Sequence, residues 1–228
     1  MDFSKWDYLY NWDGEYWHRA NLVYTPYVSP DKSTLCMSFN RNKNYHTDIE
    51  ENKKWTEEML TERFEREIKF HSMAKSFYIP TLKIRDVNVD NREIFLEWHG
   101  ADFHTQGFDV LPDWKDQWLL RLKEMWTIGI FKYSLHPNSW VAHDGVLIPF
   151  NWFFSFSRND PNITIKDFLI QISSERQEKL EQVLHAMGMD LDTPYDVNTL
   201  QKLALNSFRT NYPQDLINQA LENHALLQ

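Results

Sequence analysis

Cysteine and glycine are both scarce in this chain of 228 residues, which has one cysteine and six glycines. The single Cys36 excludes a disulfide framework and any metal site built from several cysteines. No apolar run approaches the roughly 18 residues that a membrane-spanning helix needs. The N-terminal residues also lack the basic-then-apolar order of a signal peptide, so we expect a cytoplasmic protein.

Basic residues are also few relative to acidic ones, since the chain has 24 basic and 33 acidic residues and a net charge of −9. Nucleic-acid surfaces and anionic lipids both call for a basic patch, so we expect neither a nucleic-acid partner nor a membrane partner. Aromatic residues are abundant, with ten Trp, ten Tyr and fifteen Phe. Such side chains bury large areas and anchor interfaces, so we expect another protein as partner, with the oligomeric state left open.

The first half of the chain reads as strands interrupted by one helix. Runs rich in aromatic and β-branched residues, bounded by Asp, Gly and Pro, predict antiparallel strands. Apolar residues at helical spacing predict a helix over 56–75, with Glu57 and Glu58 in its first turn, where the helix dipole favours them. The predicted strands are WDYLY, EYWHRANLVYT and STLCMSFN before this helix, and TLKIRDVNV and REIFLEW after it.

The second half reads as mainly helical, with one hairpin. Gly129 ends a helix whose apolar face carries Trp114, Trp118 and Trp126, and Asp144-Gly145 is a hairpin turn within 139–152. Three later helices are predicted. The first is capped by Ser174 with Gln177, the second is capped by Asn198, and the third begins at Pro213. The chain thus divides into a strand-rich lobe over 1–100 and a helical lobe over 101–228, which form one compact domain.

This order resembles the protein-kinase-like superfamily, which implies an α+β, two-lobed fold. The resemblance covers roughly residues 6–160 and is most specific in Leu122–Trp152, which follows the kinase-like pattern without a gap. The matching segments are Gly129-Ile130-Phe131 after the long helix, Leu135-His136-Pro137 in the catalytic-loop region, the turn Asp144-Gly145, and Ile148-Pro149-Phe150-Asn151 at the Asp-Phe-Gly motif.

The residues that carry kinase chemistry do not match. By the resemblance, the catalytic Asp falls on Ser134 and the histidine before it falls on Lys132. The metal-binding Asn falls on Ser139, the metal-binding Asp on Pro149 and the phosphate-pairing lysine on Ser38. We interpret these five as degenerate catalytic positions.

Each loss removes a physical requirement of phosphoryl transfer, which depends on carboxylates that hold Mg²⁺ and on cations that neutralise the phosphates. Serine brings no formal charge to Mg²⁺, and proline has no side-chain ligand. A glycine-rich phosphate loop is also missing, since Gly14 is the only glycine before Gly100. We therefore expect no catalytic residue, no metal and no cofactor.

Several further residues are expected in the cleft. The resemblance places Glu67 at the ion-pairing glutamate of the small-lobe helix, where it either pairs with Arg41 or Lys43 or faces water. Asn138 and Asn151 are residual nucleotide contacts or turn residues, of which we favour turns. The resemblance makes Glu97 and Trp98 part of the hinge that lines the adenine pocket.

The remaining candidate residues are histidines and tryptophans, for which a structural role is weighed before a chemical one. His99 and His104 bracket Asp102, but no metal-binding spacing supports them, so hinge-loop residues are favoured over a metal site. His136 is expected to have a structural role. Trp6, Trp12 and Trp17 crowd a small strand region and are candidate interface anchors. Missing glycines and carboxylates beside many aromatics also predict a cleft filled by side chains.

Three functions stay open at this point. The leading hypothesis is a catalytically inactive kinase-like protein that acts as a protein-binding or regulatory scaffold. An alternative is an atypical active kinase or nucleotidyl transferase that uses ATP and Mg²⁺ with relocated ligands, for which Asp144, Asp160 and Asn151 are the nearest substitutes. A third is an α+β structural or assembly protein with an aromatic interface.

Overall fold

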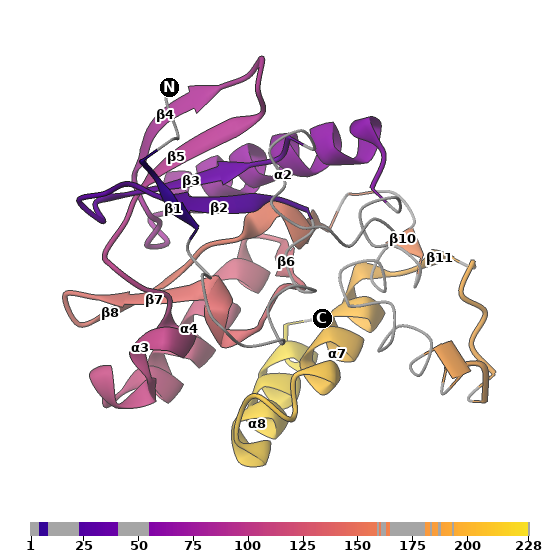
Figure 1. Ribbon diagram of the computed structural model, residues 1–228. Coiled ribbons are helices and arrows are strands. Elements are labelled where there is room, and N and C mark those ends of the chain that lie inside the picture. Colours follow the sequence, from indigo (N-terminus) through magenta and orange to yellow (C-terminus); the bar gives the residue numbers. More distant parts are fainter. Residues whose placement is uncertain are drawn as a thin grey trace.

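The computed structural model describes residues 5–8, 23–40, 55–158, 160, 163–164, 181–182, 184–186, 188–192 and 194–227. They form an α+β protein in which a small lobe, a five-stranded sheet with one helix, stands over a mainly helical lobe (Figure 1). This is the two-lobed, kinase-like arrangement predicted from the sequence. No helix within these residues is long and apolar enough to cross a membrane.

The small-lobe sheet is antiparallel throughout, with strand order β1-β2-β3-β5-β4. Its centre is the pairing of β3 with β5, whose apolar side chains pack into the core. The turn before β3 closes where Lys32 N donates to Ser29 O at 2.8 Å, as its Ser-Pro-Asp-Lys sequence predicts. The strands are β1 (Asp7–Tyr8), β2 (Thr25–Val28), β3 (Thr34–Ser38), β4 (Ile84–Asn88) and β5 (Glu93–Glu97).

Helix α2 (Glu57–Ser76) is the single long helix of the small lobe and confirms the prediction over 56–75. Thr56 caps its first turn by accepting a hydrogen bond from Met59 N at 3.2 Å. Its buried face carries apolar residues together with Glu67, and this face packs on the sheet and on the 3₁₀ helix Trp152–Phe154. Through α2, the small lobe therefore reaches the chain that follows the hairpin.

The helical lobe is built on α4 (Trp114–Thr127), whose tryptophans are buried in the core as predicted. After α4 the chain forms β6 (Ile130–Lys132), the hairpin β7 (Trp140–His143) with β8 (Val146–Pro149), and β9 (Ser155–Ser157), which pairs with β6. The other elements are α3 (Phe103–Gln106), the 3₁₀ helices Phe108–Val110 and Pro137–Ser139, β10 (Ile163–Thr164) paired with β11 (Pro194–Tyr195), α7 (Val197–Ser207) and α8 (Gln214–Ala225).

Some predicted boundaries were wrong. The hairpin strand ends at Pro149, because Asn151 takes a left-handed conformation with φ 61° that bends the chain into a 3₁₀ helix. The cap of α7 is Asp196 and not Asn198, since the Asp196 carboxylate accepts from Asn198 N and Thr199 N. Most of the strand EYWHRANLVYT and the cap predicted at Ser174 and Gln177 lie outside the described residues, as do Trp12, Trp17, Arg41 and Lys43.

Candidate functional site

Of the five positions predicted to be degenerate, Ser38 lies in the small-lobe sheet, and the other four lie between β6 and the end of β8. Ser38 ends β3, Lys132 ends β6, Ser134 follows β6, Ser139 ends a 3₁₀ helix before β7, and Pro149 ends β8. Ser38 and Lys132 are 0 % exposed and Ser139 is 1 % exposed, while Pro149 is buried and Ser134 half-buried. The region is packed protein interior.

An uncharged hydrogen-bond chain connects the two lobes there. Tyr24, just before β2, donates its hydroxyl to Asn151 Oδ1 at 2.7 Å. The amide of Asn151 donates to Ser139 Oγ at 3.3 Å and to Asn138 O at 3.5 Å. Ser139 and Ser134 share a hydrogen bond of 2.9 Å between their hydroxyls. Ser134 and Ser139, where the resemblance implied the catalytic Asp and the metal-binding Asn, are thus neutral groups bonded to each other.

Glu67 and Lys132 are the charged pair of this interior. Glu67 is 1 % exposed and accepts a hydrogen bond from Phe153 N at 2.9 Å. Lys132 Nζ donates to the carbonyl oxygens of Phe150 at 2.6 Å and Asn151 at 2.7 Å. The expectation that Glu67 faces water is therefore wrong, because the carboxylate is enclosed between α2, β6 and the chain after β8.

Burial sets the electrostatics of this pair. Burial is the largest effect and raises the pKa of Glu67 above its ordinary value. The charge of Lys132 and the N–H groups of Phe153 and Trp152 oppose this rise without cancelling it. Burial likewise lowers the pKa of Lys132, and the carboxylate of Glu67 opposes that shift. The cation near Glu67 thus comes from β6. Ser38, where the resemblance implied a lysine, has a buried hydroxyl with no hydrogen-bond partner among the described residues.

Aromatic side chains pack around the hydrogen-bond chain. Tyr24 contacts Phe39 and Phe153 with ring centroids 5.6 and 5.4 Å apart, and Phe39 contacts Phe153 at 6.1 Å. On the hinge side, Trp98 meets Phe150 edge-on at 5.6 Å. All five side chains are buried, so aromatic rings fill this contact between the lobes.

The residues predicted at the hinge and just after it make local contacts. Glu97 is half-exposed and lies 3.6 Å from Arg85, so it does not reach the interior. His99 stacks on His143 with centroids 3.4 Å apart. Asp102 caps α3 by accepting from Thr105 N at 2.9 Å. Within the described ranges, no three His, Cys, Asp or Glu side chains come close enough together to hold a metal ion.

His136 shapes the loop before β7. Its Nδ1 accepts from Asn138 N at 3.1 Å and so caps the 3₁₀ helix of Pro137–Ser139. Asn138 is 7 % exposed and takes part in the same loop, since its Oδ1 accepts from Ser139 Oγ at 3.4 Å. His136 therefore orders the loop backbone, and Asn138 positions the hydroxyl of Ser139 in the hydrogen-bond chain.

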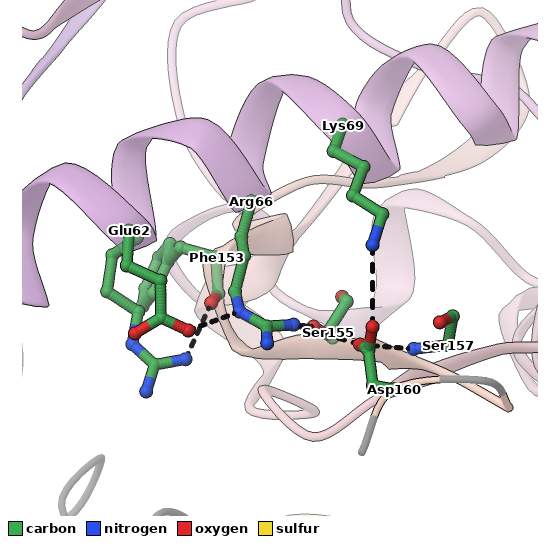
Figure 2. Close-up of polar contacts among 8 residues, drawn as sticks. Glu62, Arg66, Lys69, Phe153, Ser155, Ser157 and Asp160 are labelled. Carbon is green, nitrogen blue, oxygen red and sulfur yellow. Dashed lines mark hydrogen bonds and ion pairs between the residues drawn. The ribbon is translucent and has the colours of Figure 1, made fainter.

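A second, outer group of charges links α2 to the chain around β9 (Figure 2). Arg66 bonds to Glu62 at 2.8 Å, Ser155 O at 3.1 Å and Asp160 at 3.0 Å, and Lys69 reaches Asp160 at 3.4 Å. Asp160 also accepts from Ser157 N at 2.8 Å. Both oxygens of Asp160 are occupied, and these bonds hold its pKa below the ordinary value although burial opposes them.

The relocated ligands considered from the sequence are not brought together. Asp160 is held in the outer group, Asn151 is held by Tyr24, and Asp144 is exposed in the β7–β8 turn, 3.3 Å from His143. Sequence reasoning also missed Tyr24 and Phe153 as lining residues. No local signal marks them, since Tyr24 and Asn151 are 127 residues apart in the chain.

Comparisons with known proteins give structural likeness alone. No family model matches the chain, and no curated protein matches it by sequence. Among solved structures, the Rio2 kinase of Chaetomium thermophilum in an ADP/Mg²⁺-phosphoaspartate complex aligns with a TM-score of 0.45 and 9 % identity, over 90 % of this chain and 67 % of that one. Another structure of that kinase gives 0.43 and 9 %, over 89 % and 68 %. The likeness is one of backbone arrangement alone.

Proposed function

We propose that this chain is a kinase-like protein that does not transfer phosphate and that acts as a protein-binding or regulatory scaffold. The observation that carries the proposal is the neutral chain from Tyr24 through Asn151 and Ser139 to Ser134. It includes Ser134 and Ser139, where the resemblance implies the catalytic Asp and the metal-binding Asn, and Tyr24, Asn151 and Ser139 are buried.

The chemistry of these groups opposes catalysis. Mg²⁺ is a hard cation that is usually held by carboxylates, and a serine hydroxyl is a far poorer proton acceptor than a carboxylate. The charges of Glu67 and Lys132 influence each other, and each group is hydrogen-bonded to the backbone, Lys132 to Phe150 and Asn151 and Glu67 to Phe153. Buried rings of Tyr24, Phe39 and Phe153 pack together at this contact between the lobes.

The two alternatives have less support. An atypical kinase or nucleotidyl transferase needs converging ligands, whereas Asp144 and Asp160 lie at separate places and Asp160 is already bonded. An assembly protein with a tryptophan surface needs exposed rings. Among the described tryptophans only Trp6 is not fully buried, and it packs edge-on against Phe95 at 6.2 Å.

A transfer assay tests the proposal. The full chain is incubated with ATP labelled on the α- or γ-phosphate, with Mg²⁺ or Mn²⁺, and with a broad panel of proteins and small hydroxyl compounds. We expect no labelled product above a protein-free blank, while an active kinase processed in parallel labels its substrate. Metal-dependent transfer of either label by this chain would overturn the proposal.

A further inference from the structure

Two histidine pairs join the segment around α3 to the loop and strand around β7. In the first, which we call the stacked pair, His99 lies on His143 with ring centroids 3.4 Å apart and ring planes 8° apart. In the second, the capping pair, the rings of His104 and His136 have their centroids 5.3 Å apart. Four of the nine histidines therefore lie along one contact, which Figure 1 shows as α3 beside β7.

The hydrogen bond of His136 needs an unprotonated nitrogen. Its Nδ1 accepts from Asn138 N at 3.1 Å. Neutral imidazole has one acceptor nitrogen, whereas imidazolium has two donors and no acceptor. A proton on Nδ1 therefore removes the cap of Pro137–Ser139 and turns two N–H groups toward each other. Because Asn151 donates to Asn138 O and to Ser139 Oγ, the capped loop also supports the hydrogen-bond chain between the lobes.

Charge also decides whether the stacked pair holds. Two protonated rings at this separation repel each other. Burial is the largest effect on His99 and lowers its pKa below the ordinary 6.5, and the charges of His143 and Arg85 lower it further. The carboxylates of Glu97 and Asp144 oppose this fall without cancelling it. Asp144 lies 3.3 Å from His143 Nε2, so it favours a proton on His143.

The surroundings of the capping pair include a second carboxylate and an aromatic ring. Asp102, which caps α3, and His104 influence each other's charge. The ring of Phe208, which follows α7, contacts His136 edge-on with centroids 6.3 Å apart. Protonation of both members of the pair brings two cations together where two neutral rings now pack.

A third link in the same contact does not titrate. Gln106 Nε2 donates to Ala142 O at 3.0 Å, and Gln106 Oε1 accepts from Ala142 N at 3.0 Å. A side-chain amide keeps its charge between pH 5 and pH 8, whereas histidine changes its charge in this range. The contact between α3 and β7 thus combines one link that is independent of pH with two that depend on it.

We infer that the stacked pair and the capping pair form a pH-sensitive clasp, which is closed while their rings are neutral and opens on acidification. Opening releases the loop that His136 caps and loosens the contact between α3 and β7. Histidines held neutral by the fold bind protons less tightly than those of the unfolded chain, which titrate near pH 6.5. The clasp therefore stabilises the fold above about pH 6.5, and this stability is lost as the pH falls below that value. The inference goes beyond the proposed function and does not depend on whether the chain transfers phosphate.

Amide hydrogen exchange followed by NMR tests the capping pair. At pH 5.5 a histidine that titrates near pH 6.5 is about 90 % protonated, so about a tenth of the molecules keep the acceptor. We expect the protection factor of Asn138 N to fall by about 10-fold between pH 7.5 and pH 5.5. In H136N the Oδ1 of the new side chain is an acceptor that does not titrate, so protection should change by less than about 2-fold.

Thermal unfolding tests both pairs together. H99F/H136N replaces one ring of each pair by a side chain that does not titrate, and the phenyl ring can still stack on His143. Between pH 7.5 and pH 5.5 the Tm of the wild type should fall by at least about 2 °C more than that of H99F/H136N. The matched control H185N changes an exposed histidine outside both segments and should keep the wild-type pH dependence. Q106A should lower the Tm by a similar amount at both pH values.

Three outcomes would overturn the clasp. They are equal protection of Asn138 N at the two pH values in the wild type, the same fall of protection in H136N, and an equal loss of Tm in the wild type and H99F/H136N. The first is measured on the wild type alone, so it decides the matter even if a variant does not fold. Failure of the proposed function is a separate result, since phosphate transfer alone would show it.

Discussion

Helix α2 is tied to the chain after β8 by two charged links that differ in burial. The inner link joins Glu67 and Lys132 to the backbone of Phe150–Phe153, with both side chains at most 1 % exposed. The outer link joins Arg66 and Lys69 to Asp160, whose side chains are 18 %, 53 % and 12 % exposed. Because water screens the outer ion pairs, whereas the charges of Glu67 and Lys132 are buried, loss of an inner charge should cost much more than loss of an outer one.

The same comparison bears on function. In a kinase, the glutamate of the small-lobe helix pairs with the lysine that contacts the phosphates. Here the cation beside Glu67 is Lys132 of β6, and its hydrogens go to two carbonyl oxygens. The inner charges therefore hold two parts of the fold together, and the neutral chain from Tyr24 to Ser134 completes that contact.

Removing the inner cation should have the largest effect. K132M leaves the Glu67 carboxylate buried without its cation, which costs about 3–5 kcal/mol of unfolding free energy. Urea unfolding followed by circular dichroism measures the loss. The double variant K132M/E67Q removes the orphaned charge as well and should recover a large part of it. A loss under about 1 kcal/mol in K132M would show that the inner link is not a buried charge pair.

Acid should partly rescue K132M. Burial raises the pKa of Glu67 above its ordinary 4.5, and losing Lys132 raises it further. Glu67 therefore binds its proton more tightly in the folded state of K132M than in the unfolded state. The stability of K132M falls as the pH rises above about 4.5, and it recovers as the pH is lowered again to about 4.5. The stability difference between K132M and K132M/E67Q should therefore shrink by more than about 1 kcal/mol between pH 7 and pH 5. A difference that stays constant with pH would contradict ionisation of Glu67 as the cause.

Breaking the neutral chain should have a smaller effect. Y24F keeps the ring packing and removes the hydroxyl that Asn151 Oδ1 accepts from, which leaves a buried acceptor unsatisfied at a cost of about 1–3 kcal/mol. Chemical denaturation measures this loss of unfolding free energy. The matched control is Y78F, which removes the hydroxyl of an exposed tyrosine and should leave stability unchanged. Equal stability of Y24F and Y78F would mean that the Tyr24–Asn151 bond does not hold the lobes.

The outer link should matter least. D160N removes a partly exposed carboxylate, and we expect a loss of at most about 1 kcal/mol that shrinks as salt is added. Unfolding at low and high ionic strength measures both features. A loss as large as that of K132M, or one insensitive to salt, would end the distinction between the two links.

Local signals were enough to predict much of this fold. The α2 helix follows from the acidic first turn and the apolar spacing, and the β7–β8 hairpin follows from Asp144-Gly145. The degenerate positions were predicted from residue order alone, and of the five only Ser134 and Ser139 are joined by a hydrogen bond in the structure. What joins them was not predictable, because the Lys132–Glu67 and Tyr24–Asn151 contacts connect distant segments and depend on how the lobes pack.

Burial explains the other errors. The expectation that Glu67 faces water followed from the usual exposure of charged helix residues, whereas its pairing with Arg41 or Lys43 lies outside the described residues. The actual surroundings of Glu67 are the backbone of Phe153 and the side chain of Lys132, which no spacing in α2 reveals. Likewise, both Asp196 and Asn198 are suitable helix caps, and in the structure Asp196 accepts the first-turn hydrogen bonds from Asn198 N and Thr199 N.

Thermal unfolding with ATP and Mg²⁺ tests most directly whether the contact between the lobes is closed to a nucleotide. A ligand present at about 100 times its Kd stabilises the folded state by about 2.7 kcal/mol, which corresponds to about 5–11 °C in Tm for a chain of this size. We predict that millimolar ATP with Mg²⁺ leaves the Tm unchanged. A rise in Tm that grows with ATP concentration and needs the metal would contradict the account, because it would show a working nucleotide site where neutral and aromatic side chains now pack.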